Sequence, residues 1–387
     1  MHILIMAQHY APEDVSGAVL ATQLAEDWVR RQHQVTFVTA APSYPAGRVF
    51  AGYKNSFLST DTRNGVHIVR TWSYITPSKA PLNRLLNYGT FSMTAALGGL
   101  WARRADVVYS YSPPLTLCLS AWFVSRMHRA PWILRVEDLY PDAAVAAGVI
   151  TQPSVIRALQ AIEYFAYRHA AHVSLISETF RQRLLEKGVS SSKLSVMPVW
   201  ADPDDVRPMP KENGFREEHH LNGKFIVLYA GNLGITSSLE DVLVAAEQTK
   251  HDNDLHWVIV GEGIKRKELI QHAQAKHLQN VLFLSYQPRH RLSEMMAAAD
   301  ISLVTLNAAS ASFSLPSKVF TIMASGRPIL AISPVGSELE RVVQTHQCGW
   351  NIPPGDGEAL SQRVLWCKSH PDQLAEAGGP GGARPRA

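Results

Sequence analysis

The amino-acid sequence predicts an α/β protein that contains two doubly wound parallel sheets. Short apolar runs alternate with amphipathic segments of helix length along almost the whole chain, which is typical of repeated strand–helix units. The alternation breaks once, between residues 201 and 223, where three prolines and a run of charges occur, and then it restarts. With 387 residues, of which 46% are hydrophobic and 18% charged, the chain is long and apolar enough for two large cores.

These boundaries divide the chain into four parts. We expect a first doubly wound domain over residues 1–200, a linker over 201–223, a second doubly wound domain over 224–370 and a disordered tail over 371–387. The tail is expected because residues 377–387 consist only of Ala, Gly, Pro and Arg and cannot form a core. Ligands of such sheets bind at the carboxyl ends of the strands, so the cleft between two such domains is the expected site.

The apolar runs place the individual elements. Each run is short and mainly apolar, as is usual for strands that are covered on both faces of a parallel sheet. In the first domain we expect strands over residues 2–7, 34–39, 67–72, 107–110, 132–136, 173–176 and 194–196, and helices over 18–31, 82–104, 115–127, 155–169 and 178–187. In the second domain we expect strands over 225–229, 256–260, 281–284, 301–306 and 328–332, separated by helices.

Charge is distributed unevenly between the two halves. The chain carries 37 Lys and Arg against 33 Asp and Glu, a net charge of +4. Residues 1–200 hold 19 basic and 12 acidic side chains, whereas residues 201–387 hold 18 and 21. A basic first half favours an anionic surface or substrate there, and random scatter of surface charge is the alternative.

Cysteine usage and the N-terminus favour a cytoplasmic protein. Cys118, Cys348 and Cys367 lie far apart and form no CxxC spacing, so neither a disulfide framework nor a metal site is expected. Residues 1–7 lack the basic start of a signal peptide and are interpreted as a first buried strand.

Two motifs follow strands of the first domain. Ser16 and Gly17 stand in the turn into the first helix, where a small residue lets a ligand approach free N–H groups. Glu137 and Asp138 follow the strand over 132–136, where a carboxylate could orient a hydroxyl nucleophile or act as a general base. The structural alternatives are a simple turn at Gly17, and a turn-capping Asp138 beside a solvated Glu137.

A glycine loop opens the second domain. Gly231, Asn232 and Gly234 come directly after the strand over 225–229 and lead toward a helix. Such a loop suits a diphosphate, because the oxygens of a diphosphate accept several backbone N–H bonds without a metal. Simple turn chemistry is the alternative.

Other candidates stand at the following strand ends and at one helix start. Gly261 and Glu262 close one strand and Tyr286 closes the next, so they are expected to line a nucleotide pocket. Lys318 falls at the N-terminal end of a helix expected over 315–326, where a cation opposes the helix dipole unless an anion is bound. This misfit favours a phosphate contact over a solvated lysine.

The helix expected over 82–102 is unusually apolar. It approaches the composition and length of a membrane span. Its glycines and its place within the strand–helix alternation favour a buried or partly exposed helix instead. Because Arg84, Arg103 and Arg104 flank its apolar and aromatic residues, contact with a membrane surface remains a second hypothesis.

Taken in this order and spacing, the motifs resemble family-4 glycosyltransferases of the GT-B fold, most closely the bacterial branch that builds colanic-acid and O-antigen polysaccharides. The resemblance spans residues 1 to about 368. It rests on residues 9–12 (HYAP) with Gly17, 137–141 (EDLYP), 229–234 (YAGNLG), and 315–318 (LPSK) with 324–328 (ASGRP).

The resemblance implies two Rossmann-like domains that face each other across a cleft. It implies a retaining, metal-independent transfer of a sugar from a nucleotide-diphospho-sugar, held by the C-terminal domain, with no cofactor and no nucleic acid. The acceptor implied is a polyprenyl-diphosphate-linked saccharide on the N-terminal domain, at the inner face of the cytoplasmic membrane. Gly17, Pro316, Ser317 and Thr321 join the donor-binding residues, which also include Gly231, Asn232, Gly234, Gly261, Glu262 and Tyr286. Glu137, Asp138 and Lys318 are the catalytic candidates.

The chain departs from the wider family at four positions. Two glutamates eight positions apart are usual before the Gly-x-Pro, and here Phe313 and Thr321 stand there. The wider family has an Arg and a Lys in the second glycine loop, where this chain has Asn232 and Ser237. Lys318, together with the N–H groups of residues 231–234, is the expected replacement for stabilising the leaving diphosphate.

Two other functions fit the same residues. One is a GT-B nucleotide-sugar epimerase, which needs no second substrate. The other is a catalytically impaired member of the family that acts as a binding subunit, as the missing glutamates suggest. A dinucleotide-dependent dehydrogenase is disfavoured, because no GxGxxG follows the first strand.

Overall fold

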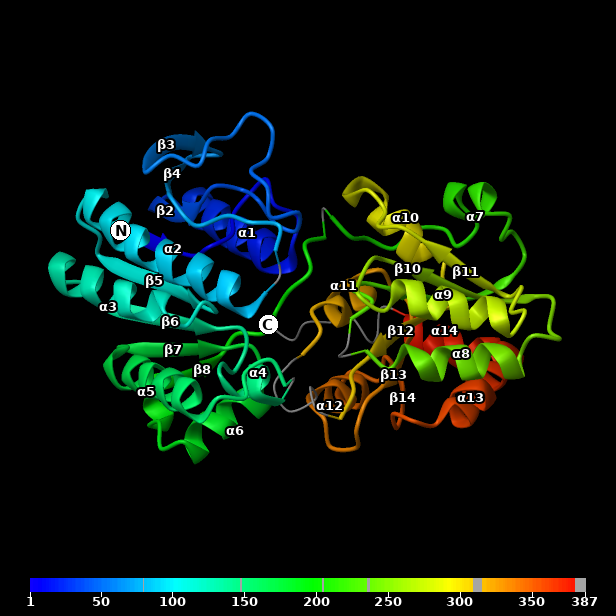
Figure 1. Ribbon diagram of the computed structural model, residues 1–387. Helices are drawn as coiled ribbons and strands as arrows, with labels where there is room; N and C mark the ends of the chain where they lie inside the picture. Colours follow the sequence, from blue (N-terminus) through cyan, green and yellow to red (C-terminus); the bar gives the residue numbers. More distant parts are fainter. Residues whose placement is uncertain (79, 147, 204, 235–236, 309–314, 380–387) are drawn as a thin grey trace. The chain divides into compact units, whose positions relative to one another are not determined.

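The computed structural model describes residues 1–78, 80–146, 148–203, 205–234, 237–308 and 315–379. They form two compact units, Met1–Pro198 and a second unit that begins at Val199 (Figure 1). Each unit is a sheet of mainly parallel strands covered by helices, which confirms the α/β class.

The first unit contains an eight-stranded sheet with the strand order β3-β4-β2-β1-β5-β6-β7-β8. All neighbouring strands are parallel except β3 and β4, which pair antiparallel. The chain order reverses between β1 and β5, and ligands of doubly wound sheets bind outside the carboxyl ends of the strands at such a switch point. The strands are β1 (His2–Met6), β2 (Gln34–Ala40), β3 (Leu58–Arg63), β4 (Val66–Thr71), β5 (Val107–Ser112), β6 (Trp132–Val136), β7 (His172–Leu175) and β8 (Leu194–Val196).

Helices cover both faces of this sheet. On one face, α1 packs Ala21 and Ala25 against Ile5 and Phe37 in a continuous core. Elsewhere α2 contacts β2 and β4, while α3 contacts β5 and β6. The helices are α1 (Ser16–Arg30), α2 (Pro81–Trp101), α3 (Leu117–His128), α4 (Asp142–Ala146), α5 (Pro153–His169) and α6 (Glu178–Glu186), with a 3-10 turn η1 (Ser191–Lys193).

The second unit contains a six-stranded sheet with the order β11-β10-β9-β12-β13-β14, and all neighbouring strands are parallel. Its core includes the fully buried Trp257, whose Nε1 donates to Thr249 Oγ1 at 3.0 Å. The strands are β9 (Phe225–Ala230), β10 (Leu255–Val260), β11 (Val281–Leu284), β12 (Ile301–Thr305), β13 (Ile329–Ile332) and β14 (Gly349–Ile352). The helices are α7 (Gly214–Glu218), α8 (Leu239–Gln248), α9 (Arg266–Ala275), α10 (Leu292–Ala297), α11 (Lys318–Ala324), α12 (Glu338–Thr345), α13 (Gly357–Ser369) and α14 (Pro371–Gly378), with a 3-10 turn η2 (Arg289–Arg291).

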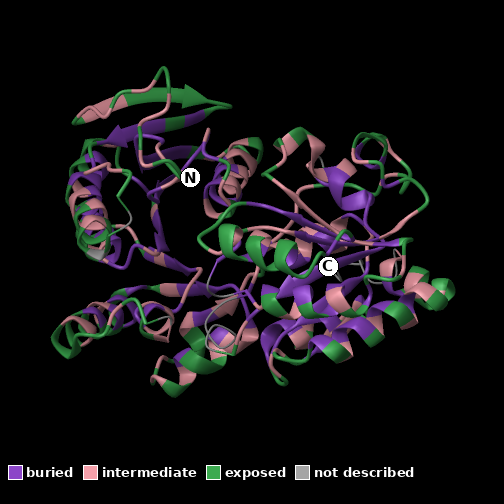
Figure 2. Ribbon diagram, turned by 45° about the vertical axis from the view of Figure 1, so that its right-hand side comes forward, coloured by how far each residue is buried: buried purple, intermediate pink, exposed green. Residues whose placement is uncertain are grey.

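Every strand expected from the sequence is present, with ends within two residues of the expected ones. Two strands were not expected, β3 and β14. Strand β3 lies at the sheet edge and has a mostly exposed, polar sequence, so it has no apolar run to reveal it; Figure 2 shows it in pink and green beside the buried purple strands. Charged and polar side chains on such an edge discourage pairing with another chain.

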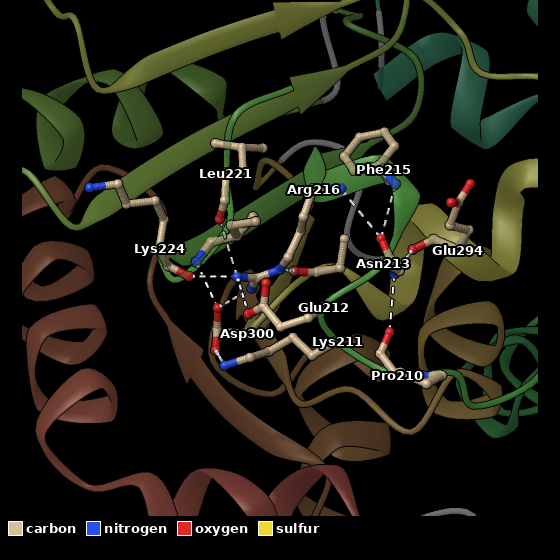
Figure 3. A network of polar contacts seen from close by, with 12 residues as sticks. Pro210, Lys211, Glu212, Asn213, Phe215, Arg216, Leu221, Lys224, Glu294 and Asp300 are labelled. Atoms are coloured by element: carbon tan, nitrogen blue, oxygen red, sulfur yellow. Dashed lines mark hydrogen bonds and ion pairs between the residues drawn. The ribbon is translucent and has the colours of Figure 1, made fainter. Parts of the chain in front are cut away.

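The segment expected to be a linker is instead folded onto the second unit (Figure 3). Arg216 of α7 is fully buried, and its Nη2 donates to Asp300 Oδ2 at 2.8 Å. Asp300 Oδ2 also accepts from the Ile226 amide at 2.8 Å, and its Oδ1 accepts from Lys211 Nζ at 2.8 Å. The prolines and charges of residues 201–223 suggested a solvated linker, but several of these charges form an ion-pair network that anchors the segment beside β9 and β12.

The disordered tail expected over 371–387 is wrong for its first part. Residues 371–378 form α14, which contacts α13 and β14 of the same unit. A Cβ on Gly378 would lie 2.8 Å from Gly326 O, so the end of α14 packs directly on the backbone that follows α11. Leu374 of α14 also packs against the core of the second unit, so one large apolar side chain and close backbone packing at glycine together hold this helix in place. Residues 380–387 lie outside the described ranges.

None of the helices in the described ranges combines the length and the hydropathy that crossing a bilayer requires.

Candidate functional site

Two glycine loops interlock at the carboxyl ends of β9 and β10. A Cβ on Gly261 would lie 1.9 Å from Gly231 O, and one on Gly263 would lie 2.3 Å from Leu233 O. Gly231 and Gly261 also have φ angles of +153° and +147°, which other residues rarely adopt. These glycines are therefore required for loop-against-loop packing, whether or not a ligand is bound.

Hydrogen bonds between the interlocked loops use some of the backbone amides that were expected to bind an anion. The Gly231 amide donates to Val260 O and the Leu233 amide donates to Glu262 O, both at 2.9 Å. In the described part of the chain, the amides of Asn232 and Gly234 donate to no acceptor. Two of the four amides in residues 231–234 are thus available to a ligand. The expectation that all four amides of the loop bind a diphosphate is therefore wrong for two of them.

Lys318 lies beside this loop. Its Nζ is 3.8 Å from the centre of the Tyr229 ring and 2.7 Å from the position that a Cβ on Gly231 would take. The Tyr229 hydroxyl donates to Asn232 O at 2.9 Å, so the ring that carries the cation is itself tied to the loop. The lysine is half-buried, and among the described residues its Nζ makes no hydrogen bond and no ion pair. The Lys318 side chain therefore points to the glycine loop over residues 231–234, with which it was predicted to act.

The remaining donor-site candidates lie in different surroundings. Glu262 is exposed and its Oε1 lies 3.5 Å from Arg266 Nε, while its carbonyl accepts from the Leu233 amide. Thr321 is one turn after Lys318 on α11, and Pro316 and Ser317 directly precede that helix. Tyr286 is exposed after β11.

Phe313 and Ser237 are two of the positions at which the chain departs from the wider family. Phe313, one of the positions where the wider family has glutamate, lies outside the described residues. Ser237, where the wider family has a cation in the loop, is buried and donates from Oγ to Gly234 O at 2.8 Å, so its role is to close the loop.

In the first unit, the structure brings Gly17 and Glu137 together. A Cβ on Gly17 would lie 3.3 Å from Glu137 Oε2, so the carboxylate stands over the first turn of α1. The Glu137 amide donates to Ser112 O at 2.9 Å, which ties the end of β6 to the end of β5. The two motifs that the sequence identified separately therefore share one place, at the switch point of the sheet.

Both carboxyl groups after β6 hold their protons more strongly than usual. Burial raises the pKa of Glu137 to about 7, and Asp138 adds to the shift whereas the Arg135 guanidinium opposes it. Burial alone raises the pKa of Asp138 to about 6. A carboxyl group with a pKa near neutrality suits proton exchange with a hydroxyl group.

Arg135 and two tyrosines form a polar layer beneath Glu137 that sequence reasoning missed. Arg135 is buried, and its Nη1 donates to Met197 O at 2.5 Å and to Ser174 Oγ at 3.2 Å. Tyr109 and Tyr111 lie nearby on β5, where burial raises the pKa of both hydroxyls. A charged residue inside an otherwise apolar strand was the available signal.

A second missed group is the pair His9 and Glu13, in the loop after β1. His9 Nδ1 lies 2.8 Å from Glu13 Oε2, and Glu13 Oε1 accepts from the amides of Ser43 and Tyr44, each at 2.8 Å. Glu13 is buried, so the pair holds the histidine ring in one orientation beside the Tyr44 ring. Their place after the first strand was the signal, but the contact depends on loop geometry that spacing does not reveal.

No group of three His, Cys, Asp or Glu side chains within the described ranges is arranged to hold a metal ion.

Family models match both halves of the chain. The model described as "Glycosyl transferase 4-like domain" matches residues 17–200, and the model described as "Glycosyl transferases group 1" matches residues 210–379. The two matches correspond to the two units and together leave little of the chain uncovered.

The proteins that are similar to the chain include two curated relatives and a solved structure. The "Probable glycosyltransferase WbjE" of Pseudomonas aeruginosa is 29% identical over 265 residues, which cover 68% of this chain and 66% of that protein. The "Putative colanic acid biosynthesis glycosyl transferase WcaI" of Escherichia coli is 26% identical over 354 residues, which cover 89% of this chain and 86% of that protein.

The solved structure is that of Anabaena Alr3699/HepE in complex with UDP-glucose. It superposes with a TM-score of 0.70 at 16% identity and covers 99% of this chain and 94% of that one. With both of its α/β units matched by glycosyltransferase models, the chain belongs to the family-4 glycosyltransferases of the GT-B fold.

Proposed function

We propose that this glycosyltransferase takes its sugar from a nucleotide-diphospho-sugar whose diphosphate binds beside Lys318 in the second unit. The observation that carries the proposal is the position of the Lys318 ammonium, half-buried over the Tyr229 ring and without an acidic partner among the described residues. A half-buried cation without a counter-ion is poorly stabilised, and stacking on an aromatic ring recovers only part of its hydration. A bound diphosphate would supply the missing negative charge.

The loop beside Lys318 supports the same ligand. The amides of Asn232 and Gly234 are available, and glycine at 231 leaves open the position next to the ammonium. An anion that touches Lys318 would therefore also reach backbone donors, which is how diphosphates are commonly held. The similar HepE protein was crystallised with UDP-glucose, which adds support for this ligand class.

The reaction proposed is a transfer with retention of anomeric configuration. The acceptor hydroxyl attacks the anomeric carbon on the face from which the diphosphate departs, so the new C–O bond forms as the bond to the phosphate oxygen breaks. The hydroxyl proton passes to the leaving phosphate. Lys318 and the two available amides stabilise the negative charge that develops on the diphosphate.

The acceptor is proposed to be a polyprenyl-diphosphate-linked saccharide that binds the first unit. Glu137 and Asp138 lie at the switch point of that sheet with raised pKa values, so they are placed to orient the attacking hydroxyl. The similarity to WcaI, which is named for colanic acid biosynthesis, supports a role in cell-surface polysaccharide synthesis. A lipid-linked acceptor would bring this enzyme to the inner face of the cytoplasmic membrane.

The experiment is a transfer assay with a panel of nucleotide-diphospho-sugars and a lipid-linked saccharide. We expect nucleoside diphosphate release that depends on the acceptor, and a product whose anomeric proton coupling in NMR matches that of the donor. An inverted product would contradict the retaining mechanism.

The same assay, together with calorimetric titration of the donors, separates the two other functions. Turnover of the donor with no acceptor present would identify an epimerase. Failure to bind any nucleotide-sugar would identify a binding subunit. Lys318→Ala is the informative variant, since loss of one electrostatic stabiliser is expected to lower the rate at saturating donor about 100-fold.

A further inference from the structure

Helix α2 presents most of its large apolar side chains outward, and apart from Phe91 its buried side is formed by small and polar residues. Ser92 and Thr94 are buried, and Thr94 Oγ1 donates to Trp72 O at 2.6 Å. Met93 and Trp101 are 74% and 68% exposed. A helix on a soluble sheet normally shows the opposite pattern, with its apolar stripe toward the core. The outward row of α2 is Leu82, Leu85, Leu86, Met93, Leu97, Leu100 and Trp101.

The neighbouring helix α3 also exposes large apolar side chains, although its buried side is mostly apolar and includes Leu117, Cys118 and Val124. Ser120 and Ser125 are buried, whereas Leu119, Phe123 and Met127 are exposed at positions four residues apart. The polar groups that face inward are satisfied by hydrogen bonds: Ser120 Oγ, for example, donates to Ser92 O at 2.6 Å.

The two outward rows lie side by side. Helices α2 and α3 contact each other along their length, as Figure 1 shows in cyan and teal. A Cβ on Gly99 would lie 2.8 Å from Val124 Cγ2, so the helices approach closely at this glycine. At their C-terminal ends, Arg104 Nε donates to His128 O at 3.3 Å. The exposed rows on these two helices form one surface, which we call the α2–α3 face.

The charges on the segment that carries the α2–α3 face are almost all positive. Residues 81–130 contain Arg84, Arg103, Arg104, Arg126 and Arg129, and Asp106 is the one acidic residue among them. Asp106 is engaged with the amide of His2 at 2.8 Å. All five arginines are exposed.

We propose that the α2–α3 face docks on an anionic lipid bilayer. Large exposed apolar patches on soluble proteins mark binding surfaces, and Leu, Met, Phe and Trp beside arginines are the side chains that enter the interface of an anionic membrane. A second copy of the chain fits less well, because two such faces would bring two sets of five arginines together. This inference rests on the lipid-linked acceptor proposed above. It names the surface through which the enzyme reaches such an acceptor.

The test is flotation of the purified full chain with vesicles, without donor or acceptor, so that failure of docking and failure of the proposed reaction are distinguishable. We expect binding to vesicles of phosphatidylglycerol and phosphatidylcholine, and much weaker binding to phosphatidylcholine alone. The double variant Leu97→Glu with Phe123→Glu should lower the partition coefficient by about 100-fold, at about tenfold or more for each apolar side chain withheld from the bilayer. Because Leu97 and Phe123 are exposed, the melting temperature should stay unchanged.

A matched control and a charge variant complete the test. Val335→Glu changes an apolar side chain that is 78% exposed in the second unit and should bind vesicles like the wild type. Arg103→Gln with Arg126→Gln keeps the apolar rows and should weaken binding to anionic vesicles by about 25-fold, at about 1 kcal/mol for each arginine. Wild-type protein that fails to float with anionic vesicles overturns the proposal, as does equal loss in Val335→Glu. A dimer in sedimentation that the double Glu variant abolishes would assign the face to a second copy instead.

Discussion

The Glu137 carboxylate lies over Gly17, with only 3.3 Å between Oε2 and the point where a Cβ on residue 17 would be. The contact joins the first turn of α1 to the end of β6, at the switch point of the first sheet. It places a carboxyl group with a raised pKa where a helix start and two strand ends meet.

Gly17→Ala tests whether this spacing matters for the acceptor. The added methyl group is expected to displace Oε2 by a few tenths of an ångström, and we expect kcat/KM for the acceptor to fall by about two- to tenfold, since misplacement by 1 Å can cost about 100-fold. Steady-state kinetics with varied acceptor measure the effect. Gly89→Ala is the control, because a Cβ at Gly89 meets no atom within 4 Å. Equal kinetics in both variants would remove Gly17 and Glu137 from the acceptor site.

Glu137→Gln tests the raised pKa through stability. Burial raises the pKa of this carboxyl from 4.5 to about 7 in the folded chain, so its contribution to stability is fully present below pH 4.5 and is lost as the pH rises through 7. Glutamine does not ionise and avoids this loss. The melting temperature of the variant should therefore rise relative to the wild type between pH 5 and pH 8, as calorimetry at both values would show. A difference that is independent of pH would contradict the shift.

Gly261→Ala tests the interlocked glycine loops. Its Cβ would lie 1.9 Å from Gly231 O at a φ of +147°, so the two loops cannot keep their positions. We expect a loss of about 2 kcal/mol or more in the free energy of unfolding, measured with urea. Gly89→Ala should have the opposite sign, a gain of about 0.5–1 kcal/mol, because it replaces glycine within a helix. Two variants of equal stability would show that the loops do not pack as described.

Asp300→Asn tests the network that anchors residues 205–224. Arg216 is fully buried, and removing its charged partner leaves a buried cation with insufficient compensation. A loss of about 3–5 kcal/mol in the free energy of unfolding is expected. Glu212 also contacts Arg216, at 3.1 Å, but its side chain is 53% exposed, so Glu212→Gln should cost less than about 1 kcal/mol. Similar losses in the two variants would mean that burial does not determine how much each ion pair contributes to the free energy of unfolding.

The fold could be predicted from the sequence because its parallel strands are buried on both faces and therefore show as short apolar runs. Strand β3 was missed for the complementary reason, since Asp61 and Arg63 at an exposed edge look like a loop. The anchored segment was mistaken for a linker because pattern alone cannot distinguish a solvated charge from one that pairs with Asp300, far along the chain.

The candidate site was predictable in position but not in detail. Strand ends and glycine loops indicated Gly17, Glu137 and the loop at Gly231. The sequence could not show that the amides of Gly231 and Leu233 are used within the loops, since that depends on the neighbouring loop at Gly261. The stacking of Lys318 on Tyr229 was also hidden, because the two residues are far apart in the chain and meet only when β9 and α11 are assembled.

Isothermal titration calorimetry with nucleotide-diphospho-sugars tests the proposed donor site most directly. The wild type should bind at least one of UDP-, GDP- or dTDP-sugars, and Lys318→Met should bind it about tenfold or more weakly, because a charged hydrogen bond to phosphate is lost. The corresponding nucleoside, which has no phosphate, should not distinguish the two proteins. Lys267→Met, which changes an exposed lysine on α9, should bind the donor like the wild type. Undiminished donor binding by Lys318→Met would contradict the assignment of the diphosphate to Lys318.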